Sequence, residues 1–144
     1  DLQDIKLDKH KLLEILVNLV QNARQAMYSV TGPRELILEI RVKDEDQVLI
    51  AVQDSGIGIV KDDLTRVFNM GFTTREEGHG FGLHSSVNAA TEMGGRLYAT
   101  SEGTGRGARF VLELPMNPPG ASSEERETAE RSAAATGLEK GGVL

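Results

Sequence analysis

The sequence has 144 residues, of which 39% are hydrophobic and 26% charged, as in an ordinary soluble domain. Its formal net charge of −6 argues against a binder of duplex nucleic acid, since such a protein needs a basic face. The chain has no cysteine, which excludes a disulfide scaffold, a cysteine-ligated metal and a cysteine nucleophile.

The chain shows neither a signal peptide nor an apolar run near the ~20 residues that cross a bilayer. We therefore expect a cytoplasmic fragment without direct membrane contact, although a longer parent protein could be membrane-anchored. The composition changes near Pro115, and the residues after it contain no isoleucine or aromatic side chain. This shift predicts a domain over residues 1–115 and a low-complexity tail over 116–144, disordered or marginally helical.

The first element is a predicted helix over residues 8–29, with Asp8 as its N-cap and Thr31-Gly32-Pro33 after its end. Its apolar residues recur at helical spacing, at Leu12, Leu16, Leu19, Val20, Ala23 and Met27. Apolar and polar residues then alternate over 35–53, with an acidic turn at 44–47. This alternation predicts a β-hairpin.

The second half begins with a short predicted helix over 61–68 and a glycine-rich loop over 69–82. A helix over 83–93 follows, ended by Gly94-Gly95, and then two strands over 97–101 and 108–114. Strands that pair as hairpins predict an α+β fold with one sheet and its helices on one face.

Two asparagines lie four residues apart on the first helix, so Asn18 and Asn22 share one face with Glu14. Asparagine is a poor helix former, and two of them on one ridge need a reason. Two interpretations stay open here: a polar packing or exposed face, or a site for phosphate or a hard cation such as Mg²⁺.

Glycine-rich segments follow the second strand and precede the second long helix. Asp54 ends a strand and is followed by Gly56 and Gly58, which would let backbone approach a ligand closely or simply form a turn. The segment from Gly78 to Gly82 would aim N–H groups at an anion or serve as a flexible connector. A Rossmann unit or a P-loop is disfavoured, because the glycines follow a loop and no Gly-Lys-Ser/Thr occurs.

The order of these motifs is the most specific feature of the sequence. The asparagine helix is followed by Asp-Ser-Gly-Ile-Gly, Phe68, Gly-Phe-Thr-Thr, Gly-His-Gly-Phe-Gly-Leu and Gly-Gly. This succession resembles the catalytic and ATP-binding domain of bacterial sensor histidine kinases, over about residues 5–115. Gyrase, Hsp90 and the mismatch-repair protein MutL belong to the same superfamily. The resemblance implies the Bergerat fold, a two-layer α/β sandwich with a mixed, mostly antiparallel sheet and helices on one face.

The resemblance also assigns roles to residues. Asn22 would bind Mg²⁺ that bridges the ATP phosphates, and Asn18 would support the phosphate and metal site. These two asparagines are the catalytic candidates. Asp54 would accept a hydrogen bond from the adenine amine, and residues 69–80 would form the ATP lid. The implied nucleotide-binding residues are Asn22, Asp54, Gly56, Gly58, Ile59, Phe68, Thr73, Thr74, Arg75, Gly78, His79, Gly80, Phe81, Gly82 and Leu83.

Three positions depart from the family pattern. Many members carry a lysine where this chain has Gln25, next to Arg24, and many carry a threonine at Ala108. Asn18 stands where gyrase-like members carry a catalytic glutamate, which argues against efficient hydrolysis by the gyrase route.

The resemblance predicts a histidine kinase domain that holds ATP with Mg²⁺ and donates the γ-phosphoryl group to a histidine elsewhere. The acceptor histidine would lie on a separate helical dimerisation domain of the parent kinase, with a response regulator downstream. The alternatives are an anti-sigma-type serine kinase and an ATP-dependent protein-interaction module.

Overall fold

The fold is that of a computed structural model, which describes residues 7–69 and 82–116. Helix α1 (Lys9–Ala26) leads to strands β1 (Leu36–Lys43) and β2 (Gln47–Asp54). Two 3₁₀ turns follow, η1 (Lys61–Asp63) and η2 (Arg66–Phe68). Helix α2 (Gly82–Glu92) precedes strands β3 (Arg96–Thr100) and β4 (Ala108–Pro115).

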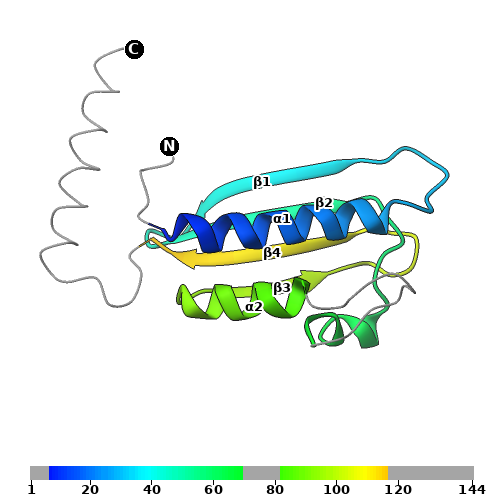
Figure 1. Cartoon of the computed structure of the whole chain (residues 1–144). Coiled ribbons are helices and arrows are strands. Elements are labelled where there is room, and N and C mark those ends of the chain that lie inside the picture. The colour runs from blue at the N-terminus through cyan, green and yellow to red at the C-terminus, as the bar shows by residue number, and fades with distance from the viewer. Residues whose placement is uncertain (1–6, 70–81, 117–144) are drawn as a thin grey trace, which may run out of the picture.

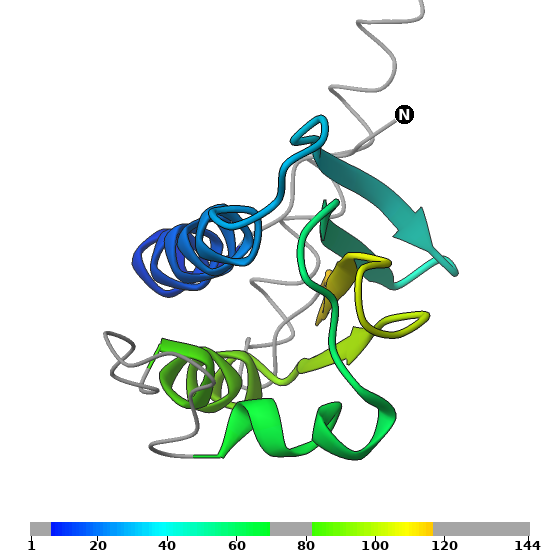
Figure 2. The same cartoon turned by 90° about the vertical axis from the view of Figure 1, so that its right-hand side faces the viewer.

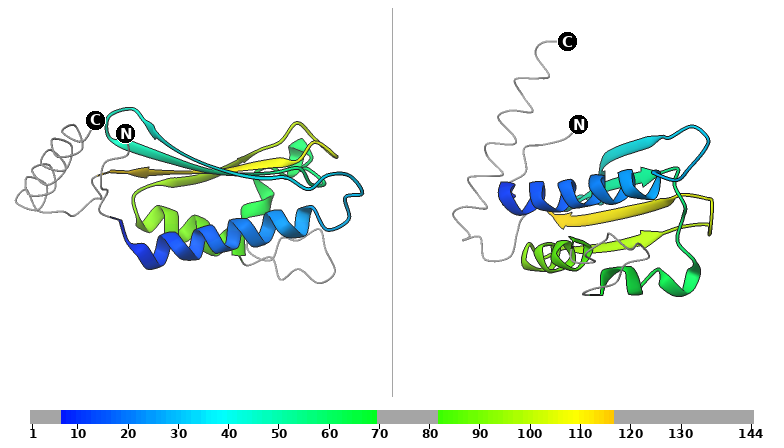
Figure 3. Two further views of the ribbon diagram at one scale, coloured as in Figure 1. Left: turned by 90° about the horizontal axis from the view of Figure 1, so that it is seen from above. Right: turned by 45° about the vertical axis from the view of Figure 1, so that its right-hand side comes forward.

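The four strands form one sheet in the order β1-β2-β4-β3, and all three pairings between them are antiparallel. Helices α1 and α2 lie side by side on one face of this sheet (Figure 1). The end-on view in Figure 2 and the view from above in Figure 3 show the two layers. The predicted two-layer α+β sandwich is thereby confirmed.

Helix α1 begins where the sequence predicts and ends earlier. The Asp8 carboxylate accepts hydrogen bonds from the backbone N–H groups of His10 and Lys11, at 3.1 and 3.2 Å. At the other end the carbonyl of Ala26 accepts a hydrogen bond from Ile57 N–H at 2.9 Å. A partner distant in sequence therefore takes up a terminal carbonyl of the helix, five residues before Thr31.

The main core lies between the helices and the sheet. Helix α1 contributes fully buried Ile15 and Leu19, which pack with buried residues of β2 and β4 such as Phe110 and Leu112. On edge strand β1 the apolar residues of the helix-facing side stay exposed, because α1 packs over β2. These exposed residues are Leu36, Leu38, Ile40 and Val42.

The remaining elements follow the predicted positions closely. Helix α2 and strand β3 each begin and end one residue before the predicted bounds. The single short helix predicted over 61–68 is instead two separate 3₁₀ turns, of which the second buries Val67. No helix in the described ranges is long and apolar enough to cross a membrane.

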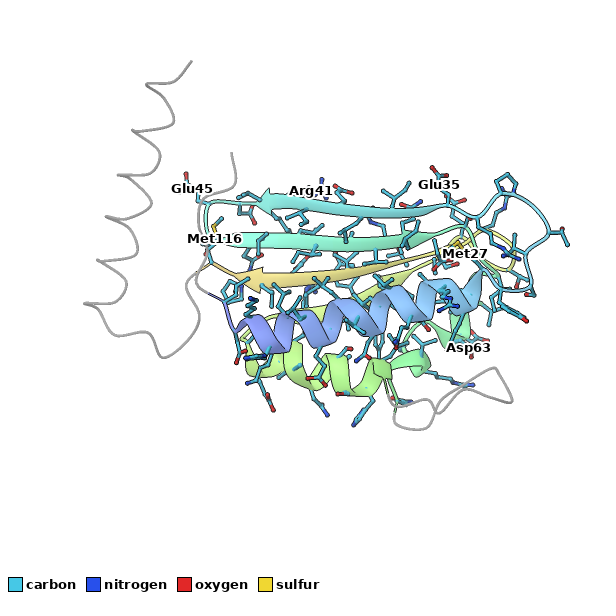
Figure 4. The ribbon with its side chains drawn as sticks, turned by 45° about the horizontal axis from the view of Figure 1, so that its top comes forward. Met27, Glu35, Arg41, Glu45, Asp63 and Met116 are labelled. Carbon is cyan, nitrogen blue, oxygen red and sulfur yellow. The ribbon has the colours of Figure 1, made fainter. Side chains whose placement is uncertain are left out.

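The last described residue of the C-terminal part is Met116. Its N–H donates to the carbonyl of Asp46 at 2.8 Å, which places it at the β1–β2 turn beside Glu45 (Figure 4). Residues 117–144, and with them the predicted tail, lie outside the described residues.

Candidate functional site

The predicted site residues that the structure describes gather towards the end of the sheet opposite Met116. Figure 4 shows Met27, which caps α1, and Asp63 of η1 at this end. Strand β2 also ends here, and the Ser55 hydroxyl lies 3.6 Å from the Met27 sulfur. The C-terminus of α1, the end of β2 and the turn between β3 and β4 thus meet at one place.

Asp54 is a buried carboxylate at the end of a central strand. It is only 4% exposed, and its Oδ1 accepts a hydrogen bond from Gly56 N–H at 2.8 Å. It lies on the helix-facing side of the sheet, two residues after buried Val52. Its partner across the β2–β4 register is Ala108. This local hydrogen bond fixes the carboxylate, and the small Ala108 opposite adds no polar group.

The loop after Asp54 is tied to two other parts of the chain. Ile57 N–H donates to Ala26, while Gly107 N–H donates to the Gly56 carbonyl at 3.1 Å. A Cβ on Gly56 would overlap the backbone carbonyl of Ala26, and Gly58 has φ of +75°. Both positions therefore require glycine. Gly56 does so because two backbone segments lie so close there, and Gly58 because of its backbone conformation.

Ile59 follows this loop and is held by a residue that the sequence analysis did not single out. Its N–H donates to the Ser101 hydroxyl at 3.0 Å, and the same hydroxyl donates to the Gly107 carbonyl at 2.6 Å. Ser101 thus joins the loop to the β3–β4 turn. The only hint in the sequence is its place at the start of a glycine-rich turn.

The asparagine face of α1 points toward α2. The Asn18 side-chain amide donates to the Gly82 carbonyl at 3.3 Å and to the Ser86 hydroxyl at 3.1 Å. On the same face, Ser85 donates to Glu14 at 3.0 Å. The amide hydrogens of Asn18 therefore serve the packing of α1 on the first turn of α2, which is one of the two interpretations that the sequence left open. Ser86, fully buried in this contact, is a second residue that sequence reasoning missed.

Asn22 lies one turn further along α1 and has a different environment. It is half-buried, and its side chain makes no hydrogen bond to another described residue. Since α1 and α2 run antiparallel, with Lys11 paired to Glu92 and Asn18 to Gly82, Asn22 lies beyond the N-terminus of α2. Asn22 is therefore the residue of the asparagine face that lies on the side of the positive end of that helix.

Phe68 and Leu83 lie on the two sides of the segment 70–81. Phe68 packs edge-to-face against Phe110, with ring centroids 6.1 Å apart, and Leu83 packs against the main core. His84 Nδ1 lies 3.2 Å from the Phe68 carbonyl oxygen. The predicted residues Thr73, Thr74, Arg75, Gly78, His79, Gly80 and Phe81 lie outside the described residues.

Metal-ligating residues do not cluster in the part of the chain that the structure describes. No group of three or more His, Cys, Asp or Glu there could hold a metal ion. Among the described residues, the Asn22 amide oxygen could ligate a cation at this end together with oxygens from a bound ligand. Oxygen-only coordination of that kind suits Mg²⁺, which keeps several waters and binds substrate phosphates.

Comparisons with known proteins identify the family of this chain. The profile of the family described as histidine kinase-, DNA gyrase B- and HSP90-like ATPase matches residues 7–118. Sensor histidine kinase ZraS of Escherichia coli O157:H7 is 39% identical over 116 residues, covering 81% of this chain and 24% of ZraS. Sporulation kinase E of Bacillus subtilis is 32% identical over 130 residues, covering 90% of this chain and 17% of that kinase.

Solved structures give the same result. The full-length structure of ShkA in complex with AMPPNP matches with a TM-score of 0.72 and 29% identity, covering 83% of this chain and 24% of ShkA. The catalytic domain of histidine kinase ThkA matches with a TM-score of 0.67 and 28% identity, covering 79% of this chain and 73% of that domain. The chain therefore spans about a quarter or less of the two curated relatives and most of an isolated catalytic domain. It belongs to the family of histidine kinase-, DNA gyrase B- and HSP90-like ATPases, in the form found in the catalytic domains of sensor histidine kinases.

Proposed function

We propose that this chain binds ATP with Mg²⁺ and donates the γ-phosphoryl group to a histidine on a separate helical dimerisation domain of its parent kinase. The observation that carries the proposal is the buried Asp54 carboxylate, which lies beside a glycine turn at the end of the sheet where α1 terminates. The AMPPNP complex of the similar protein ShkA supports an ATP-type ligand.

Asp54 would select the base. A carboxylate accepts a hydrogen bond from the exocyclic amine of adenine, whereas the O6 of guanine is itself an acceptor and would be repelled. The Gly56 N–H group holds one carboxylate oxygen, so the orientation of the acceptor is set before a nucleotide binds. A site built for one hydrogen bond strongly rejects an analogue that leaves it unpaired.

Asn22 and the N-terminus of α2 would receive the phosphates. The Asn22 amide oxygen fits a hard cation, and the eleven-residue helix α2 presents N–H groups and a positive dipole end beside it. When bound, Mg²⁺ would neutralise charge that develops on the phosphate oxygens. Asn18 would act indirectly by holding the first turn of α2 in place.

Phosphoryl transfer asks mainly for positioning and charge neutralisation. A neutral imidazole is already nucleophilic, so this domain needs no strong base to activate the acceptor. The name of the relative ZraS, a sensor histidine kinase, favours a histidine acceptor over the serine-kinase alternative. A response regulator downstream is part of the same proposal.

Nucleotide titration of the wild type and of Asp54→Asn tests this function. We expect the wild type to bind ATP with Mg²⁺ and to bind GTP at least about tenfold more weakly. Asp54→Asn should lose most of its ATP affinity, while Asp62→Asn, at a nearby exposed carboxylate, should keep it. Equal affinities of the wild type for ATP and GTP, or wild-type ATP binding by Asp54→Asn, would rule out the proposed role of Asp54.

A further inference from the structure

We propose that His84 is a positioning residue that fastens the start of α2 to the end of η2 through the Phe68 carbonyl. The role rests on the proposed function, because η2 and α2 are the elements before and after the glycine-rich segment. The contact between His84 and Phe68 is not among those that the family resemblance implies.

The two residues belong to different elements that the chain connects by a long path. Phe68 is the last residue of η2, and His84 is the third residue of α2. They are 16 residues apart in sequence, yet His84 Nδ1 lies 3.2 Å from the Phe68 carbonyl oxygen. Within the described ranges no other hydrogen bond joins η2 to α2. The imidazole therefore supplies a hydrogen bond between η2 and α2, beside the packing of Phe68 and Leu83 against the main core.

The partners of the ring determine its tautomer. A carbonyl oxygen can only accept, so Nδ1 must carry the hydrogen. Nε2 then has a lone pair, and the Asn88 side-chain amide lies 3.4 Å away, one helical turn later. A neutral ring with hydrogen on Nδ1 satisfies both contacts. Asn88 thereby favours the tautomer that donates to Phe68.

Helix α2 does not need His84 in order to stay packed on the rest of the fold. Helix α2 is already attached on its other side by Asn18, and its buried residues Ala89 and Ala90 pack in the core. His84 itself is only half-buried. Its specific contribution is to fix where η2 ends relative to the N-terminus of α2, and so to reduce the ordering that a bound nucleotide would otherwise have to impose.

The tautomer is tested without any nucleotide. Long-range ¹H–¹⁵N spectra of the labelled chain distinguish Nδ1–H from Nε2–H imidazoles, and His84→Asn identifies the His84 signals by their loss. We expect Nδ1–H at His84, whereas exposed His10 should show the Nε2–H form that free histidine prefers. An Nε2–H tautomer at His84 would overturn the proposed hydrogen bond.

Nucleotide affinity then tests the positioning role. Loss of one neutral hydrogen bond in His84→Ala should weaken binding of a non-hydrolysable ATP analogue about fivefold. His84→Asn should stay within about twofold of the wild type, because an asparagine Nδ2–H occupies nearly the same position as the Nδ1–H. His10→Ala, at the far end of α1, serves as the control and should bind normally.

The outcomes separate the two proposals. Wild-type affinity in His84→Ala, or equal losses in His84→Ala and His84→Asn, overturns the positioning role and leaves the proposed function intact. A wild-type chain that binds no ATP analogue overturns the proposed function, and the positioning role with it.

Discussion

Gly56 shows how close the chain segments lie around the candidate site. A Cβ there would meet the carbonyl of Ala26, a backbone atom that also accepts the Ile57 N–H hydrogen bond. Backbone cannot move aside as the end of a flexible side chain can. The end of α1 and the loop after β2 therefore determine each other's position.

Gly56→Ala should destabilise the chain by more than about 2 kcal/mol in urea denaturation, because the new methyl group separates the loop from α1. Gly32→Ala is the matched control, since a Cβ at Gly32 meets nothing within 4 Å. It should be neutral or stabilising by up to about 1 kcal/mol, through lower entropy of the unfolded chain. Equal effects of the two substitutions would contradict the close approach at Gly56.

Asn22→Ala should abolish Mg-dependent ATP binding without lowering the thermal midpoint. The Asn22 side chain makes no hydrogen bond to another described residue, and alanine is the better helix former. Calorimetric titration with a non-hydrolysable ATP analogue and Mg²⁺ measures the binding. Gln21→Ala, at the exposed neighbouring position, should bind as the wild type does. Undiminished affinity in Asn22→Ala would remove the proposed metal-ligand role.

At the scale of elements, a charged cluster connects the strands on the outer face of the sheet, opposite the helices. Buried Leu49, Ala51 and Val111 lie on this face. Glu113 is 5% exposed there and accepts hydrogen bonds from Arg96 at 2.9 Å, Lys43 at 2.9 Å and Tyr98 at 3.1 Å. These contacts connect β1, β3 and β4 across the sheet.

The Glu113 cluster should make stability depend on acid pH. The hydrogen bonds from Arg96, then Lys43, lower the pKa of Glu113 from 4.5 to about 2. Since the pKa is lower in the folded chain, the stabilisation is fully present above about pH 4.5 and is lost as the pH falls toward 2. Glu113→Gln should cost about 1 to 3 kcal/mol at pH 7, and its difference from the wild type should shrink between pH 4.5 and 2.

Urea denaturation at pH 7 and pH 2.5 measures this effect. Glu39→Gln is the matched control, because Glu39 pairs with Arg109 at 2.8 Å on the same face but is more exposed. It should give a smaller loss at pH 7. A Glu113→Gln penalty that stays constant down to pH 2.5 would show that the carboxylate charge does not stabilise this face.

At the scale of the whole molecule, neither His10 nor His84, the two histidines in the described ranges, is suited to accept the phosphoryl group. His10 precedes Asn22 by twelve residues on the same helix, which is about 18 Å along its axis. His84 is engaged by the Phe68 carbonyl. A tethered acceptor domain would instead be presented at an effective concentration of up to about mM.

The chain alone should therefore bind ATP without phosphorylating itself on histidine. Labelled γ-phosphate should appear on a separately supplied acceptor domain of the parent kinase, and not on a version of that domain whose acceptor histidine is replaced by glutamine. Acid-labile label on this chain alone, near one per molecule, would contradict its assignment as a donor only.

The longer helices, the strands and the family could be predicted from the sequence alone, whereas the two 3₁₀ turns and the end of α1 could not. Hydrophobic periodicity reflects the burial of one face, which is a local property of the chain, so α1, the β1–β2 hairpin and α2 could be predicted. The order of the asparagine, aspartate and glycine motifs identified the kinase-type ATP-binding domain before any geometry was known.

The contacts between these residues, in contrast, are known only from the tertiary structure. Asn18 contacts Ser86, 68 residues later, and β2 pairs with β4 rather than β3, which sets Asp54 opposite Ala108. The end of α1 at Ala26 depends on Ile57, and the tautomer of His84 depends on Phe68. Such contacts join residues far apart in the chain and leave no local period in the sequence, because their energy is realised only once the two layers have packed.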